Sequence, residues 1–239
     1  MRTFLGIVLI GIMVGSVAFA QGNGPGRGDC GGRPGNIEAL PYEEVDDTER
    51  EDLLYMREEE KLARDVYRAM DDLWGLRALR NIAGAEQTHM NALLKILDKY
   101  DILDSVGDAP AGQFANEQLQ QLYNDLVAQG SQSLTDALIV GATIEDLDIH
   151  DLDEALARTD NEDIRTVYQN LQKGSRNHLR AFTNLLEGSG VTYEPQYLSV
   201  DQFEEILSTS MERGRVDADG EPLNCPGRGG PRHRYGRNR

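Results

Sequence analysis

A glutamate and a histidine, Glu86 and His89, stand three residues apart in the stretch AGAEQTHMNALL. The residues around them form an apolar helical stripe, so both side chains would face the protein interior. Residues three apart project from the same side of a helix, which lets a carboxylate and an imidazole act on one common partner. Burying either group is costly unless it is paired or bound to a metal. The pair therefore predicts either a metal site or a closed polar network.

Three further expected helices carry polar residues near the middle of their apolar stripes. These residues are Glu60 in one helix, Glu145 and Asp148 in another, and Ser175 and His178 in the last. Several carboxylates buried together would cost many kcal/mol, and two imidazoles cannot neutralise all of them at neutral pH. A divalent or trivalent metal cation could neutralise these carboxylates. Mixed carboxylate and imidazole donors suit iron, manganese or zinc, whereas calcium sites take oxygen alone.

Helical periodicity accounts for almost all of the chain between its glycine-rich ends, and strand-like alternation is rare. We expect four long helices and two short helical segments, in the order 48–74, 76–100, 116–130 (short), 133–158, 161–187 and 199–214 (short). The loop and short segment between the second and third long helices can return the chain to the other end of a bundle. The fold class is therefore all-α, a four-helix bundle with a crossover segment. The last short helix is expected to end at Gly214 and to pack on the bundle end.

Three consecutive glutamates occur in the first expected helix. At three-four spacing only Glu60 fills the gap in the apolar stripe, so Glu58 and Glu59 are expected to point elsewhere. Two further histidines, His150 and His233, fall outside the stripes and are assigned to the surface and to the C-terminal tail.

Four strings, EEEKLARDVYRAM, AGAEQTHMNALLKIL, VGATIEDLDIHDL and LQKGSRNHLRAFTNLLE, together resemble a bacterial ferritin-like domain family of unknown function, within the ferritin-like di-iron carboxylate proteins. The resemblance covers residues 53–187, and the spacing Glu60-x-x-Ala63-x-x-x-Tyr67 is similar to the first-helix motif of rubrerythrins. It implies a ferritin-like four-helix bundle with a carboxylate and histidine centre for a pair of iron ions. The ligands that it implies are Glu60, Glu86, His89, Glu145 and His178.

One position departs from the general di-iron pattern, because the last long helix carries Ser175 where that pattern has a glutamate. Asp148, one turn from Glu145, could reach the second metal instead, or it could cap a helix or face solvent. A mononuclear centre therefore stays open. Tyr67 and Tyr168 are candidates for contact with the ligands, against the alternative that both are plain core residues.

The two ends of the chain differ from its body. The first residues, MRTFLGIVLIGIMVGSVAFA, have a basic start, an apolar run and a small-residue ending, which predicts a secretory signal peptide over 1–20 and export to the periplasm or beyond. A single membrane anchor is the alternative. The expected domains that follow are a Gly-rich flexible segment, the bundle and a disordered basic tail, at 21–46, 47–213 and 214–239. Cys30 and Cys225 could form one disulfide in an oxidising compartment or remain unrelated thiols.

Charge is unevenly distributed along the chain. Residues 37–212 hold 14 Lys and Arg against 37 Asp and Glu, while residues 225–239 hold five Arg and no acid. The acidic body would repel nucleic acid, and we give the Gly/Arg-rich tail no function. A homodimer stays open, whereas the long ends argue against a large storage shell.

Metal pairs held by carboxylates can react with oxygen or peroxide, so ferrous oxidation, peroxide reduction and oxygen activation are all available. With two cysteines in all, the chain has no rubredoxin-like set to supply electrons to a peroxidase cycle. We therefore expect an exported protein that oxidises bound ferrous iron or captures metal. The alternative is an exported binding or envelope module whose polar residues form a metal-free hydrogen-bonded network.

Overall fold

The computed structural model describes residues 40–223, in which the chain forms helices and no strand. The helices are α1 (Asp47–Trp74), α2 (Arg77–Lys99), α3 (Glu117–Gly130), α4 (Leu134–Arg158), α5 (Glu162–Gly188) and α6 (Val200–Ser208). No helix of this described part is long and apolar enough to cross a membrane. The predicted signal peptide, Cys30, Cys225 and His233 lie outside the described residues.

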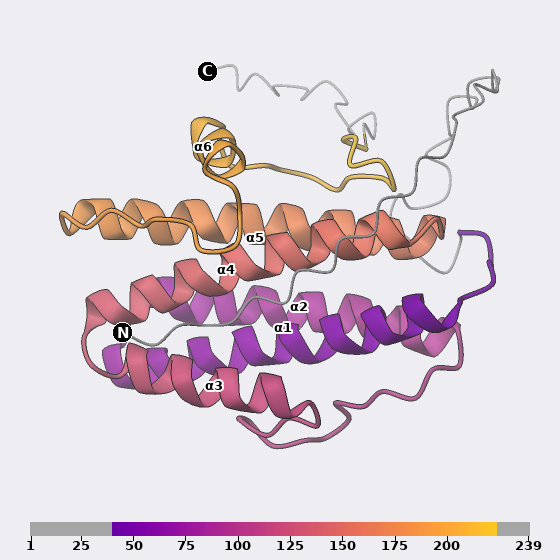
Figure 1. Cartoon of the computed structure of the whole chain (residues 1–239), viewed down its shortest axis with the longest axis horizontal. Helices are drawn as coiled ribbons and strands as arrows, with labels where there is room; N and C mark the ends of the chain where they lie inside the picture. Colours follow the sequence, from indigo (N-terminus) through magenta and orange to yellow (C-terminus); the bar gives the residue numbers. More distant parts are fainter. Residues whose placement is uncertain (1–39, 224–239) are drawn as a thin grey trace, which may run out of the picture.

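Four of the helices, α1, α2, α4 and α5, lie side by side as a bundle (Figure 1). The pairs α1/α2 and α4/α5 are antiparallel, and the pairs contact each other through α1 with α4 and α2 with α5. Residues 100–116 and α3 return the chain to the end of the bundle where α1 stops, and the Trp74 indole donates to the Gly130 carbonyl there, at 2.9 Å. The expected all-α helical bundle is confirmed.

Local signals set the ends of the long helices. Asp46 accepts a hydrogen bond from the Glu49 amide at 2.8 Å, and the Glu49 carboxylate accepts one from the Asp46 amide at 3.0 Å, which makes a capping box at the start of α1. The Ser133 hydroxyl caps α4 by accepting a hydrogen bond from the Asp136 amide at 3.0 Å, and Gly75 ends α1 with φ of 63°. The four long helices therefore begin and end within one residue of the expected positions.

The last helix is shorter than expected and lies elsewhere. α6 ends at Ser208 instead of Gly214, and the chain continues in extended conformation from Thr209. The cause is a tertiary contact, because Arg180 of α5 donates to the Ile206 carbonyl at 2.8 Å and to the Thr209 hydroxyl at 2.7 Å. α6 packs against the outer side of α5, and the prediction that it covers the bundle end is wrong (Figure 1).

Residues 214–223 belong to the described chain, although the sequence places them in the tail. They form a turn with an isolated bridge between Val216 and Pro222. The Asn170 side chain of α5 donates to the Val216 carbonyl at 2.8 Å and accepts from its amide at 3.1 Å. The ordered region therefore extends past the expected boundary at 213.

The core of the bundle consists of two apolar clusters with polar residues between them. Each long helix contributes to both clusters, for example through Leu62, Leu79, Leu138 and Phe182 in one and Leu53, Leu93, Leu152 and Ile164 in the other. Between these clusters lies what we call the polar layer, which consists of Glu59, Glu60, Glu86, His89, Glu145, Asp148, Ser175 and His178. All four long helices therefore bring polar side chains to the middle of the bundle.

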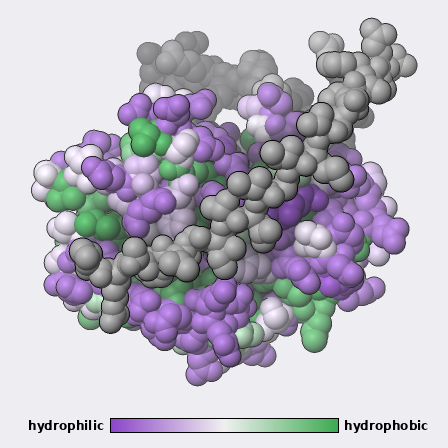
Figure 2. Space-filling view, viewed as in Figure 1, coloured by the Kyte–Doolittle hydropathy of each residue, from purple (hydrophilic) through white to green (hydrophobic). Residues whose placement is uncertain are grey.

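Hydrophilic side chains cover most of one face of the molecule (Figure 2). On the face drawn in Figure 2, hydrophilic residues predominate and hydrophobic residues form small, separate areas. The whole chain has 24 Lys and Arg against 41 Asp and Glu, a net charge of -17. Such a charge balance attracts cations and repels polyanions.

Candidate metal centre

The five residues that the resemblance implies as ligands meet in the polar layer. α1 provides Glu60, α2 provides Glu86 and His89, α4 provides Glu145, and α5 provides His178. The three carboxylate residues are 3%, 0% and 0% exposed, and the side chains of the two histidines are 13% and 12% exposed. The one-turn spacing in α2 points both of its side chains inward, as expected.

Glu86 lies between the two histidines. Its Oε2 is 2.7 Å from His89 Nδ1, and its Oε1 is 2.9 Å from His178 Nδ1. Glu60 Oε2 is 3.2 Å from His89 Nδ1, and Glu145 Oε2 is 3.4 Å from His178 Nδ1. The side chains thus form two groups, 60–86–89 and 86–145–178, and in each group the potential ligand atoms lie within 4.8 Å of one another. Glu86 belongs to both groups, so one carboxylate is shared between them.

Several buried atoms of the polar layer have no hydrogen-bond partner. They are both carboxylate oxygens of Glu86 and of Asp148, Glu59 Oε1, Glu145 Oε2 and His178 Nδ1. The short distance between Glu86 Oε1 and His178 Nδ1 is therefore an ion-pair contact without hydrogen-bond geometry. Buried polar atoms of a folded protein normally have partners. Atoms that converge without bonding one another suit a cation placed between them.

Two other residues determine how the ligands are oriented. The Tyr67 hydroxyl donates to Glu145 Oε1 at 2.5 Å, so this tyrosine contacts a candidate ligand as expected. Gly174 of α5 lies against the His89 ring, because a Cβ added there would come within 2.5 Å of Nε2. His89 therefore directs Nδ1 toward the carboxylates and Nε2 toward the α5 backbone. Sequence reasoning did not single out Gly174, although a glycine inside a helical pattern is a recognisable signal of close packing.

Other candidates have different surroundings. The buried Ser175 hydroxyl donates to a carbonyl of its own helix at 3.3 Å and supplies no carboxylate. Tyr168 lies in an apolar cluster, with Asp52 and Glu49 among the charged groups around it, which is the surrounding of a core residue. His150 lies at the surface as expected, with a side chain 40% exposed and 3.6 Å from Glu154.

The consecutive glutamates at 58–60 are all buried, contrary to the prediction that only one faces inward. Glu58 accepts a hydrogen bond from the Asn116 amide at 3.1 Å, where its negative charge favours the N-terminus of α3. Glu59 lies within hydrogen-bonding reach of Asp151 on α4. The physical reason is that α1 packs against α2, α3 and α4, so more than one of its faces is buried.

Asp148 contributes to neither ligand group, although the sequence suggests it as a substitute for the missing carboxylate at 175. It is 3% exposed, and neither of its side-chain oxygens has a partner. Its pKa is raised by burial and by the charges of Glu59 and of the ligand candidates Glu145, Glu60 and Glu86.

The electrostatics describe a cluster that retains protons when no cation balances its charge. Burial raises the pKa of Glu60 to about 7, against the lowering effect of His89. Burial lowers the pKa of His178, but the negative charges of Glu86 and Glu145 outweigh this effect and raise that pKa to about 10. Burial and neighbouring carboxylates hold the pKa of Asp148 well above its usual range. A cation that binds here must therefore displace protons.

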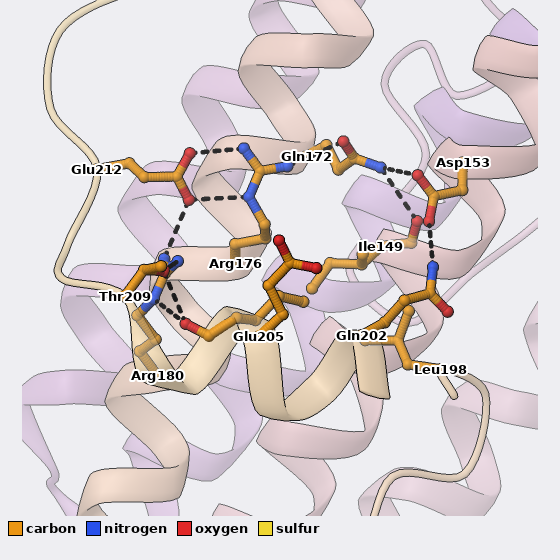
Figure 3. A pocket seen from close by; sticks show the side chains of 11 residues that line it. Ile149, Asp153, Gln172, Arg176, Arg180, Leu198, Gln202, Glu205, Thr209 and Glu212 are labelled. Atoms are coloured by element: carbon orange, nitrogen blue, oxygen red, sulfur yellow. Dashed lines mark hydrogen bonds and ion pairs between the residues drawn. The ribbon is translucent and has the colours of Figure 1, made fainter. Parts of the chain in front are cut away.

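A second polar region surrounds a cavity of about 470 Å³ between α4, α5, α6 and the chain that follows α6 (Figure 3). The Arg176 guanidinium donates two hydrogen bonds to the Glu212 carboxylate, at 2.8 and 2.6 Å, and a third to Gln172 at 2.9 Å. Arg180 donates to the same carboxylate at 3.1 Å, and Gln172 donates to Asp153 at 2.6 Å. These groups satisfy one another, so the network fastens α6 and its extension to the bundle.

The geometry defines a helical-bundle protein with two carboxylate–histidine groups in its middle. A family model described as "Uncharacterized protein domain (DUF2202)" matches residues 49–210, and the chain belongs to this family. The chain is 52% identical over 178 residues to "Uncharacterized protein MJ0754" of Methanocaldococcus jannaschii, a match that covers 74% of this chain and 96% of that protein. It is also similar to a crystal structure of hypothetical protein MJ0754 from Methanococcus jannaschii, with a TM-score of 0.72, 52% identity, and coverage of 73% of this chain and 99% of that one.

Proposed function

We propose that this protein is an exported, ferritin-like metal-binding protein whose polar layer holds two cations, with iron as the first choice and manganese or zinc as alternatives. Glu60, Glu86 and His89 would hold one ion, and Glu86, Glu145 and His178 would hold the other, so Glu86 would serve both. The observation that supports this most is the position of Glu86, since it belongs to both ligand groups and neither of its buried oxygens has a hydrogen-bond partner.

The donor set fits such ions. Each group offers two carboxylates and one imidazole, a mixture that suits iron, manganese and zinc. Two divalent ions would supply four positive charges to a polar layer that holds five carboxylates, those of Glu59, Glu60, Glu86, Glu145 and Asp148. Three protein donors for each ion leave coordination positions open for small molecules.

Bound iron would supply the electrons for the reduction of oxygen or peroxide. The residues of the chain bind the ions and keep the ligands in place. Tyr67 holds Glu145 through its hydroxyl, and Gly174 gives the His89 ring its room. The apolar clusters on both sides of the polar layer limit the access of bulk water. Because the whole chain has two cysteines, oxidation of bound ferrous iron is favoured over a peroxidase cycle.

The test is elemental analysis of residues 21–239, purified without a metal-affinity tag and loaded anaerobically with ferrous iron. We expect about two ions per chain, lost in Glu86→Gln and kept in Glu212→Gln, which removes a carboxylate from the cavity network. Mixing the loaded protein with oxygen or peroxide in a stopped-flow instrument then tests oxidation. If the loaded protein consumes neither oxygen nor peroxide, the proposed oxidation of iron is wrong, and metal capture remains as the proposed function. No bound metal in the unmodified protein would sink the whole proposal.

A second candidate function is that of an exported binding or envelope module without metal. The ion-pair distances from Glu86 to His89 and His178 favour it, because two protonated imidazoles can stabilise a buried carboxylate. The two functions differ in their response to a strong chelator. The metal-binding protein loses melting temperature on chelation, whereas a metal-free network does not respond.

A further inference from the structure

A row of oxygen-bearing side chains leads from the polar layer toward the surface, along the seam between α1 and α4. Helix α4 carries Glu145, Asp148 and Asp151 on successive turns, and α1 carries Glu59 and Tyr55 one turn apart in the opposite direction. Asp148 and Glu59 are 3% and 2% exposed, whereas Asp151 and Tyr55 are partly exposed. The row therefore runs from buried to accessible positions.

The members of this row contact one another in sequence. The Tyr55 hydroxyl donates to Asp151 Oδ2 at 3.4 Å, near the surface. Asp151 lies within hydrogen-bonding reach of Glu59, which is the next member inward. The charges of Glu59 and of Glu145, a member of the second ligand group, both raise the pKa of Asp148. The carboxylates from the partly exposed Asp151 to Glu145 therefore act on one another's charge along the seam between the two helices.

Two members of the row have oxygens that nothing in the described chain satisfies. Both side-chain oxygens of Asp148 and the Oε1 atom of Glu59 are buried without a hydrogen-bond partner. Burying such oxygens is costly unless something binds them. Neither residue belongs to the two ligand groups around Glu86. Their oxygens are free to replace, one after another, the water molecules around a hydrated divalent cation.

We propose that Asp151, Glu59 and Asp148 form an entry path for a divalent cation, from the surface between α1 and α4 to the two groups around Glu86. This inference rests on the function proposed above. The cation meets Asp151 first, exchanges water for carboxylate oxygens at Glu59 and Asp148, and then reaches the ligand groups. The acidic field of the body raises the cation concentration at the mouth.

The test uses Co²⁺ as a probe, because its visible absorption reports binding without oxidation. Metal-free protein, residues 21–239, is mixed with Co²⁺ in a stopped-flow instrument under anaerobic conditions. We expect Asp151→Asn and Glu59→Gln to bind as much Co²⁺ at equilibrium as the unmodified protein, but with a loading rate at least about tenfold slower. Glu154→Gln is the matched control, since it removes an exposed charge three residues from Asp151 and should leave the rate within about twofold.

Each of the following results would contradict the proposed entry path. Wild-type loading rates in both variants would mean that the cation enters elsewhere. A lower final amount of bound Co²⁺ would mean that these residues are ligands. Equal slowing in the Glu154→Gln control would mean that the net charge of the surface sets the rate. If the unmodified protein binds no Co²⁺ at all, the proposed function fails together with the path, and this result is distinct from the other three.

Discussion

The polar layer and the network around the cavity both bring charged side chains into the protein, but they differ in how those charges are satisfied. In the cavity network, the Glu212 carboxylate receives hydrogen bonds from Arg176 and Arg180 at 2.6 to 3.1 Å. In the polar layer, Glu86 and Asp148 keep four buried oxygens without such partners. The first region is more exposed and is closed by its own residues, whereas the second is buried and acidic.

This difference separates a structural role from a binding role. A network in which every group has a partner needs nothing from outside, and its contribution is to hold neighbouring elements together. A buried acidic cluster whose oxygens lack hydrogen-bond partners is stabilised when a cation binds to it. Cavity size is therefore the poorer guide to function in this molecule, because the cavity lies in the satisfied region.

The largest expected effect is that of Glu86→Gln, which removes the residue shared by both ligand groups. We expect both cations to be lost, and with them a metal-linked stabilisation of about 4 kcal/mol when free metal is present at about a thousand times its Kd. Elemental analysis and thermal unfolding measure the two losses. The matched variant in the other region, Glu212→Gln, should keep both cations. Retention of one full equivalent by Glu86→Gln would show that the groups do not share this residue.

In the metal-free protein, the contributions of the two regions to the free energy of unfolding should change with pH in opposite directions. Burial lowers the pKa of His178, but the charges of Glu86 and Glu145 raise it to about 10. Its stabilisation is fully present below the usual pKa of 6.5 and is lost as pH rises toward 10. We expect the free energy of unfolding to fall by about 1 kcal/mol per pH unit between about pH 7 and 9.

Glu212 of the cavity network supplies the opposite sign. Burial raises its pKa, but hydrogen bonds and charges of Arg176 and Arg180 outweigh this effect and lower it. Its stabilisation is present above the usual range of a glutamate and is lost as pH falls through the folded-state pKa. Urea unfolding of chelated protein across acidic and alkaline pH, with and without Glu212→Gln, measures both slopes. A rise in stability from pH 7 to about 9 would contradict the assignment of charges in the polar layer.

Arg176→Met tests the cavity network directly. The variant leaves Glu212 with one guanidinium instead of two, so we expect a loss of about 2 kcal/mol in the free energy of unfolding. The loss should be the same in metal-loaded and chelated protein, because sites that share no partner contribute additively. Denaturant unfolding in both states measures it. A loss that depends on metal would mean that the two regions are coupled.

The smallest expected effect is that of Gly174→Ala, in which the added methyl group contacts the His89 ring on its Nε2 side. An added Cβ would lie 2.5 Å from His89 Nε2, so the ring must shift. We expect the affinity of the 60–86–89 group for metal to fall about tenfold, with the other group unchanged. Competition titration with a chromophoric chelator measures both affinities. Gly84→Ala on α2 is the control, since an added Cβ meets nothing within 4 Å and should stabilise the protein by about 0.5 kcal/mol.

The helix boundaries were largely predictable from the sequence, because the residues that set them act locally. Asp46, Gly75 and Ser133 start or end their helices through contacts within one turn. The end of α6 was not predictable in this way. It depends on Arg180, which is distant in the sequence and donates a hydrogen bond to the Ile206 carbonyl in the last turn of that helix.

The candidate ligands could be predicted because polar residues interrupt apolar stripes at mid-length. The surroundings of the ligands could not, because they depend on how the helices contact one another. Glu59 was expected to face away, since a single stripe was assumed for α1, yet this helix is buried against three others. Tyr67 belongs to the motif that carries the resemblance to rubrerythrins, whereas Gly174 signals close packing in the sequence but not which side chain it contacts.

The position of the polar layer at mid-length has a consequence for local unfolding. In most helical proteins the ends fray first, and the amide hydrogens in the middle of each helix exchange with solvent last. Here an apolar cluster lies on each side of the middle, and the least favourable contacts lie between them. Without a cation, amides near residues 86 and 145 should exchange earlier than those in the two apolar halves. A bound cation would thus join two half-cores into a single cooperative unit.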